Sequence, residues 1–315
     1  MNLTQVDSNA TITLNYWNTF VKAVGKNVTV VVLGITINYI NATMIHTFNK
    51  YHIFRLNPRY ILFIHLVFND IIQLSTSISL FIFSYAFHTI HVSLCLLLIL
   101  PAIFTTQNTP LNIAFMAAEC CVSVCIPLRY SYICTVKRTY IVIGIIWAIS
   151  SLSILPDLFI LLAVESSQFL QSRVVCNRDT VFRNSYSVKK RDASHTLFLV
   201  VVSVTLLYTY CRILFVARCA DSDTKKARNT ILIHGFQVLL CTTVYVQPPL
   251  IKLLVTFFPE GLSDINFATF IINQVLPRLG SPIIYGLRDK TFRKFLKRHL
   301  CAVNHLPKII WKLSS

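Results

Sequence analysis

The residues with the most evident chemical potential lie in the stretch MAAECCVSVCIPLRY, which runs from Met116 to Tyr130. It brings one carboxylate close to three thiols, at Glu119, Cys120, Cys121 and Cys125. A metal site would need further histidine or acidic ligands nearby, and the stretch has none beyond Glu119. HExxH, GxSxG and phosphate-binding glycine-loop motifs are also missing from the sequence. We therefore expect that the protein is not an enzyme and that these thiols hold no metal.

Two ionisable residues, Asp70 and Arg278, stand in otherwise apolar surroundings. A charge in such a run costs about 2.5–3.5 kcal/mol in a membrane unless it faces the protein interior and has a partner. One expectation is therefore a direct pair between Asp70 and Arg278. The alternative is that Arg278 bonds backbone carbonyls that Pro277 leaves without a donor, and the sequence leaves both open.

The composition of the chain indicates that its solvent is lipid. Of the 315 residues 55% are hydrophobic and 13% are charged, and only 7 are glycines. The net charge of +17 could suggest nucleic acid, but the aliphatic background leaves no soluble basic surface to bind it. We predict an all-α bundle of seven transmembrane helices, because seven apolar stretches reach the ~20 residues that cross the hydrocarbon: Val24 to Phe48, Tyr60 to Ala86, Val92 to Cys125, Tyr140 to Val164, His195 to Ala217, Asn229 to Val255 and Ile265 to Leu287.

The distribution of lysine and arginine orients this bundle. If the amino terminus lies outside, the inner loops and the tail carry most of the basic residues that flank the spans. The basic residues left outside fall mainly in one long loop between the fourth and fifth spans. We therefore expect a multi-pass protein of the plasma membrane with an extracellular amino terminus and a cytoplasmic carboxyl terminus.

These boundaries divide the chain into an extracellular segment (residues 1–23), a transmembrane domain (24–287) and a cytoplasmic tail (288–315). The first segment holds two sequons for N-linked glycosylation, at Asn2 and Asn9. It lacks the basic, apolar and small-residue pattern of a signal peptide, so we expect the first span to act as an uncleaved signal.

Placement of the 10 cysteines predicts one disulfide. Eight of them fall within spans, on the inner side or in the tail, where thiols are kept reduced or lie buried and inert. Cys95, at the outer start of the third span, and Cys176, in the long outer loop, face the oxidising side. They are the natural pair, and their bond would tie the loop over the mouth of the bundle.

Several short motifs, in order on successive spans, carry a family resemblance. They are LNPRYILF (56–63), MAAECCVSVCIPLRY (116–130), Trp147, KARNTILIH (226–234) and SPIIYGLR (281–288). In this order they resemble the motifs of rhodopsin-like (class A) G-protein-coupled receptors, and specifically those of odorant receptors of the fish type. The resemblance implies a receptor that binds a small odorant within the bundle and activates a heterotrimeric G protein of the stimulatory olfactory type.

The same resemblance places the switch that meets the G protein at Glu119, Cys120, Cys121, Tyr208, His234 and Tyr285. The chain departs from the family pattern here, because Cys120 stands where the family has an arginine, Ser281 where it has an asparagine, and Thr242 where it commonly has an aromatic residue. A thiol cannot reproduce the permanently charged fork of arginine, so no ionic latch can join Glu119 to residue 120. Either the receptor couples through altered contacts, which we favour because the spans are intact, or it folds with impaired signalling.

The resemblance also implies that Asp70, Arg278 and Ser281 form a polar core, in which Asp70 holds either Arg278 or a sodium ion. A ligand pocket is expected between helices three, five, six and seven, beneath the Cys176 loop. Its candidate residues are Ile99, Ala102, Ile103, Thr106, Gln107, Ser194, Thr196, Tyr245, Pro249, Phe270 and Gln274. They favour a small, mostly apolar ligand with one or two hydrogen-bonding groups. The cluster Lys189 to Asp192 could bind a carboxylate, but we expect a solvated rim there.

After the seventh span, Phe292, Phe295, Leu296 and Leu300 share one face of a helix whose other face is basic. This pattern predicts a short amphipathic eighth helix along the anionic inner leaflet. The alternative from another class is a small membrane transporter. Its marks would be an internal repeat or broken helices in matching halves, and the sequence shows neither.

Overall fold

The computed structural model describes residues 3–87, 89–217, 262–282 and 291–296, together with positions 232, 235, 236, 239, 250, 251 and 253–258. Within these residues, five helices are long and apolar enough to cross a membrane, and they coincide with the first five predicted spans. The sixth predicted span, Asn229 to Val255, falls mostly outside the described residues. The described part is thus an all-α, multi-pass arrangement, as the sequence predicts.

The long helices are α1 (Leu3–Lys50), α3 (Pro58–Phe87), α4 (Val92–Cys125), α6 (Val136–Val164) and α9 (Ser185–Ala217). Short helices lie between them: α2 (His52–Arg55), α5 (Pro127–Ile133), α7 (Ser167–Gln171) and α8 (Arg178–Val181). On the seventh predicted span, α11 (Leu262–Phe270), the π-helix η2 (Ile271–Val275) and α12 (Leu276–Pro282) follow one another without a break.

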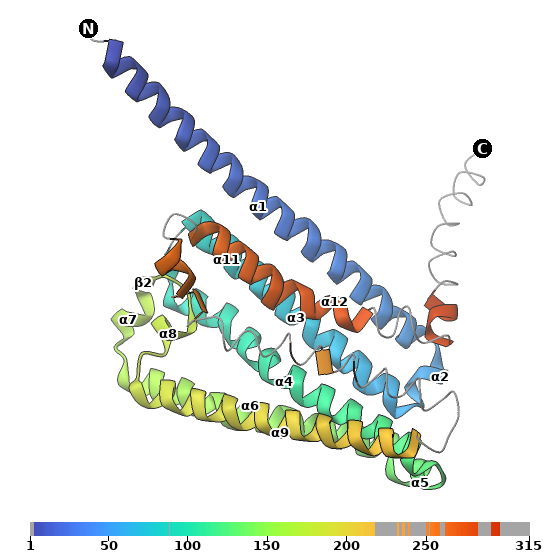
Figure 1. The fold of residues 1–315 in the computed structure, drawn as a ribbon. Coiled ribbons are helices and arrows are strands. Elements are labelled where there is room, and N and C mark those ends of the chain that lie inside the picture. Colours follow the sequence, from blue (N-terminus) through green and yellow to red (C-terminus); the bar gives the residue numbers. More distant parts are fainter. Residues whose placement is uncertain are drawn as a thin grey trace, which may run out of the picture.

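The third predicted span, α4, lies at the centre of the bundle. It packs against α3, α6 and α9, while α3 in turn contacts α1 and α12 (Figure 1). Helix α1 starts at Leu3, well before the predicted start of the first span at Val24, and its amino-terminal part projects beyond the other helices (Figure 1). Asn9 lies within this helix, whereas Asn2 is outside the described residues. Glycosylation of both stays a prediction.

Helix ends follow local sequence signals. Pro58 opens α3, where a missing N–H costs nothing, and the side chain of Asn57 accepts a hydrogen bond from the backbone N–H of Arg59 at 3.1 Å. Thr135 caps α6 by accepting from the backbone N–H of Arg138 at 3.3 Å. These signals fix where α3 and α6 begin on the predicted inner side. Arg59, at the start of α3, and Tyr130 of α5 both contact Glu119 near the end of α4.

The outward faces of the helices are apolar. Leu152 on α6 is 76% exposed and Leu97 on α4 is 70% exposed, and many further large aliphatic and aromatic side chains of α6 and α9 also point outward. In water such a surface would aggregate, whereas in a bilayer it meets hydrocarbon at no cost. The polar residues lie inside instead, with Asn69, Asp70, Gln73 and Asn112 almost completely buried.

The helical segment 291–296 agrees with the predicted eighth helix. Phe292 is fully buried, with its ring 5.2 Å from that of Phe54 and 5.5 Å from that of Phe63. The ring of Phe295 lies 4.5 Å from that of Tyr51. The apolar face of the segment therefore packs on α2 and the start of α3, and its neighbours Arg293 and Lys294 are exposed. Leu300 and the rest of the tail lie outside the described residues.

The predicted disulfide is present between Cys95 and Cys176, whose Cα atoms are 5.6 Å apart. Beside it, β1 (Ile90–His91) and β2 (Arg173–Val174) form a short two-stranded antiparallel sheet in which Ile90 pairs with Val174. Asn177 then caps α8 with a reciprocal pair of hydrogen bonds to Thr180. Since these contacts follow one another along the loop, they hold α8 at the end of the bundle.

The contact between Gly34 of α1 and Ile78 of α3 generates a stability prediction. A Cβ atom on Gly34 would overlap Cδ1 of Ile78, whereas a Cβ on Gly25 in the same helix would meet nothing within 4 Å. Both Gly34→Ala and Gly25→Ala gain about 1 kcal/mol of helix propensity. The difference in stability between the two variants therefore measures the cost of the overlap. We expect Gly34→Ala to be less stable than Gly25→Ala by about 1–3 kcal/mol. The thermal midpoints of the two purified variants measure this difference, and equal midpoints would contradict the close packing.

Candidate functional site

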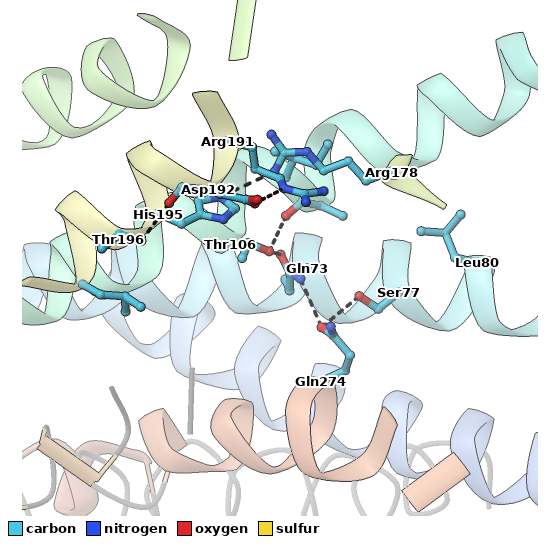
Figure 2. A pocket seen from close by; sticks show the side chains of 13 residues that line it. Gln73, Ser77, Leu80, Thr106, Arg178, Arg191, Asp192, His195, Thr196 and Gln274 are labelled. Atoms are coloured by element: carbon cyan, nitrogen blue, oxygen red, sulfur yellow. Dashed lines mark hydrogen bonds and ion pairs between the residues drawn. The ribbon is translucent and has the colours of Figure 1, made fainter. Parts of the chain in front are cut away.

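A cavity of about 410 Å³ opens at the end of the bundle that carries the disulfide. Its walls come from α3, α4, α8, α9 and η2, which are brought together from distant parts of the chain (Figure 2). Leu80, Ala102, Ile103 and Leu199 supply apolar surface, and the remaining lining is polar or charged. This volume lies within the usual range for small-molecule sites, which are mostly apolar with a few placed polar groups.

A relay of hydrogen bonds forms the polar side of the cavity. The hydroxyl of Thr106 donates to Oε1 of Gln73 at 3.0 Å, and Nε2 of Gln73 donates to Oε1 of Gln274 at 3.1 Å. Ser77 also donates to Oε1 of Gln274, at 3.2 Å, and Thr105 donates to Oε1 of Gln73. Both amide oxygens are thus occupied, while Nε2 of Gln274 has no acceptor among the described residues.

Charged side chains form the opposite side of the cavity, where Figure 2 shows Arg178 and Arg191 above the relay. Arg191 is paired with Asp192 at 2.8 Å and with Asp179. Arg178 lies 3.5 Å from Nε2 of His195 and 3.8 Å from Oδ2 of Asp157.

Lys190 is the close partner of Asp157, at 2.7 Å. The basic cluster that we expected to be a solvated rim is therefore divided. Lys190 binds an acid on α6, whereas Arg191 and Asp192 line the cavity.

The predicted ligand residues separate into two groups in the structure. Ala102, Ile103, Thr106, Thr196 and Gln274 line the cavity, and Ile99, Gln107, Ser194 and Phe270 do not. Gln107 is buried and donates to Ser153 of α6 at 3.2 Å, because its position turns it toward that helix. Tyr245 and Pro249 lie outside the described residues.

Ile99 and Phe270 pack into the protein instead of lining the cavity. Ile99 belongs to an apolar cluster with Val181 of α8. The ring of Phe270 lies 4.5 Å from that of Phe81.

Sequence reasoning missed the contribution of the second span and of the outer loop. Gln73, Ser77 and Leu80 come from α3, and Arg178 comes from α8. A signal was present, since Gln73 and Ser77 are polar, four residues apart and so on one face of an apolar helix. Nothing in the sequence indicated that this face meets Gln274, which is 201 positions away.

The polar core contains both of the arrangements that were left open for Arg278. Its Nε lies 4.0 Å from Oδ1 of Asp70, and both side chains are almost completely buried. Its Nη1 also donates to the carbonyl of Asn273 at 3.0 Å, four residues before Pro277, which has no N–H to offer it. A sodium ion at Asp70 does not fit this arrangement, because Arg278 already brings a positive charge to that carboxylate. Ser281 lies in α12.

A second polar cluster lies at the other end of α4, around Glu119. Nε and Nη2 of Arg59 donate to its two oxygens at 3.1 and 3.2 Å, and Nη2 also reaches Ser123 at 3.1 Å. The phenol of Tyr130 donates to Oε1 of Glu119 at 2.7 Å. Burial raises the pKa of Tyr130 above its ordinary value, and the charge of Glu119 raises it further. The phenol therefore stays protonated and remains a donor.

The thiols of this stretch pack among apolar side chains. Cys120 and Cys121 are buried in a small apolar cluster with Ile213 of α9, and Sγ of Cys121 lies 3.7 Å from Sγ of Cys125. Tyr208 is exposed on α9. Among the described residues, no group of three or more metal-binding side chains comes together. His234 and Tyr285 lie outside the described residues.

Comparison with known proteins places this geometry in context. The sequence matches the family model described as 7 transmembrane receptor (rhodopsin family) over residues 40–285. It is 30% identical to Odorant receptor 131-2 of Danio rerio, across 94% of this chain and 93% of that protein. Olfactory receptor 6C76 of Homo sapiens is 25% identical across 62% of this chain and 64% of its own length. Melatonin receptor type 1A-A of Danio rerio is 23% identical across 61% and 56%, respectively.

The buried pair of Asp70 and Arg278 generates a prediction about the core. Asp70→Asn leaves a buried guanidinium without its counter-charge, so we expect it to lower the stability of the folded protein by about 3 kcal/mol. The double variant Asp70→Asn with Arg278→Met removes both charges and should regain most of that loss. Thermal unfolding of the purified variants measures both effects. A double variant no more stable than Asp70→Asn would show that the charges are not coupled.

Proposed function

Because this chain belongs to the rhodopsin family of seven-transmembrane receptors, we propose that it is a chemosensory receptor. It binds a small odorant in the cavity beneath the disulfide-tied loop and transmits binding to a heterotrimeric G protein of the stimulatory olfactory type. The relative that is similar over nearly its whole length is named an odorant receptor, which supports this class of ligand. The observation that carries the proposal is the cavity itself.

The cavity suits a small ligand for two physical reasons. Its apolar walls can desolvate a hydrocarbon body, and its polar groups are positioned by hydrogen bonds within the protein. A ligand transmits a signal only through its different affinity for two conformations of the receptor. The cavity joins α3, α4, α8, α9 and η2, so a change in its contents can alter how these elements pack together.

The proposed function requires one orientation in the plasma membrane, with the cavity outside and the Glu119 cluster inside. Two features support it: the surplus of lysine and arginine on the predicted inner side, and the disulfide, which needs an oxidising compartment. In this orientation the sequons at Asn2 and Asn9 are extracellular and open to glycosylation. The loop around Arg129 and the tail then face the G protein.

At the inner end, we propose that Arg59 takes over the role of the arginine that Cys120 replaces. Its guanidinium grips both oxygens of Glu119, a planar geometry that a cysteine cannot offer. Together with Tyr130, this pair ties the start of α3 and the α5 loop to the end of α4. Such a tie stabilises one packing of the inner end, which we assign to the resting state.

The ligand role of the cavity is tested by filling it. Ala102→Trp places an indole in the cavity, whereas Leu152→Trp adds the same group to an outward face of α6. With a reporter of intracellular cyclic nucleotide, an odorant panel should give responses from the wild type and Leu152→Trp, and Ala102→Trp should lose them at equal surface expression. Responses that survive in Ala102→Trp would place the ligand elsewhere. A wild type that reaches the surface and answers no odorant would favour impaired signalling.

Because we assign the contact between Arg59 and Glu119 to the resting state, we expect its loss to raise basal signal. Arg59→Gln releases Glu119 and should shift the receptor toward its signalling state by about 1 kcal/mol, or about fivefold, since the pair is partly exposed to solvent. Arg55→Gln removes an exposed arginine from α2 nearby and should leave basal signal unchanged. Basal cyclic nucleotide per surface receptor is the quantity to compare. Equal basal signal in the two variants would remove Arg59 from the switch.

A further inference from the structure

Only some of the charged side chains near the cavity line its interior. Three acids and three bases meet at this end of the bundle, but only Arg178, Arg191 and Asp192 among them line the cavity. The carboxylates of Asp157 and Asp179 lie behind the lining, where Lys190 and Arg191 hold them. The wall that a ligand meets is therefore positive by one charge.

Among the basic residues of this wall, Arg178 is the best placed to bind an anionic group of a ligand. Asp192 is already bound to Arg191 at 2.8 Å, and Asp157 is bound to Lys190 at 2.7 Å. Arg178 lies 3.8 Å from Oδ2 of Asp157 and 3.5 Å from Nε2 of His195, and these contacts hold its guanidinium at the wall of the cavity. The planar guanidinium of arginine matches a carboxylate with two parallel hydrogen bonds, and its side chain is only 20% exposed here.

The other end of the cavity also offers a donor. The oxygens of Gln73 and Gln274 accept from hydroxyl and amide groups, and Nε2 of Gln274 has no acceptor within the described part of the chain. Figure 2 shows Gln274 on the side of the relay away from the arginines. Between these ends, Leu80, Ala102, Ile103 and Leu199 line the space with hydrocarbon.

We propose that the natural ligand of this cavity is a small organic acid, with its carboxylate against Arg178, an apolar body, and an acceptor near Gln274. This inference rests on the ligand role proposed above for the same cavity. Arg178 is then a specificity-determining residue, because loss of its charge leaves a carboxylate in a poorly hydrated site without a partner. An ammonium group at the same place would meet two guanidinium groups and be repelled.

The first test compares ligands that differ only in the head group. Straight-chain acids from butanoic to decanoic acid, and phenylacetic acid, are each matched with the alcohol, the amine and the methyl ester of the same skeleton. Binding is measured directly, as thermal stabilisation of the purified full-length receptor. We expect at least one acid to bind about tenfold or more tightly than its matched compounds. Acids that bind no better than their esters or amines, or that do not bind, overturn the proposal.

The second test assigns the effect to one side chain. Arg178→Gln should weaken binding of the best acid about tenfold or more and change binding of its ester little. Arg178→Lys keeps the charge without the planar fork and should fall between the two. Arg173→Gln changes an exposed arginine of the same loop that does not line the cavity, and it should bind the acid like wild type. Equal losses for acid and ester in Arg178→Gln would indicate a merely structural role and overturn the assignment.

The two proposals can fail separately. If neutral odorants bind and raise the cyclic nucleotide reporter while acids do neither, the receptor function stands and the acid class is wrong. If an acid binds through Arg178 and the reporter never responds, the ligand class stands and the signalling function is wrong.

Discussion

Polar groups in this protein must find partners inside the bundle, because the hydrocarbon around it offers none. This constraint gathers the polar residues of α3, α4, η2 and α12 along one interior line. The amides of Gln73 and Gln274 lie toward the end with the disulfide, Asp70 and Arg278 lie deeper, and Glu119 and Arg59 lie at the opposite end. Each helix is thereby fixed in its rotation, since turning it would leave a buried group unpaired.

The same interior line of polar residues connects the two ends of the proposed receptor. Gln73 of the cavity and Asp70 of the core are three residues apart on α3, and Gln274 and Arg278 are four apart on the seventh predicted span. The π-helix η2 lies at this level, where Pro277 withholds its N–H and Arg278 supplies a donor to the carbonyl of Asn273. A ligand that changes the relay therefore acts on groups within one helical turn of the buried ion pair.

The outer loop completes the cavity in a different way. Its position depends on covalent and backbone contacts: the disulfide, the pairing of β1 with β2 and the cap of α8. These hold Arg178 at the cavity, while Lys190 forms the closer ion pair with Asp157 of α6. From the sequence we expected this loop only to cover the cavity. In the structure it also supplies Arg178, whose charge we propose selects the ligand.

Much of the fold could be predicted because length, apolarity and charge are properties of single segments. The first five spans, the Cys95–Cys176 bond and the amphipathic segment at Phe292 all follow from such local patterns. The family followed from the order of short motifs. Five of the predicted ligand residues line the cavity, because the outer half of a helix can be read from its position in the span.

Most contacts between helices could not be predicted from the sequence. The pairing of Asp70 with Arg278 was one of two open alternatives, because both are charged residues in apolar spans. Arg59 and Glu119 are 60 positions apart, and Gln73 and Gln274 are 201 apart, so nothing local indicates that they meet. Only the packing of the helices decided that Gln107 turns to α6, that Arg178 lines the cavity, and that Glu119 pairs with Arg59. The sequence by itself determined which segments enter the bilayer, because transfer into lipid depends on each segment's own side chains. The tertiary structure decided which polar groups become partners, because that depends on the rotation of one helix against another.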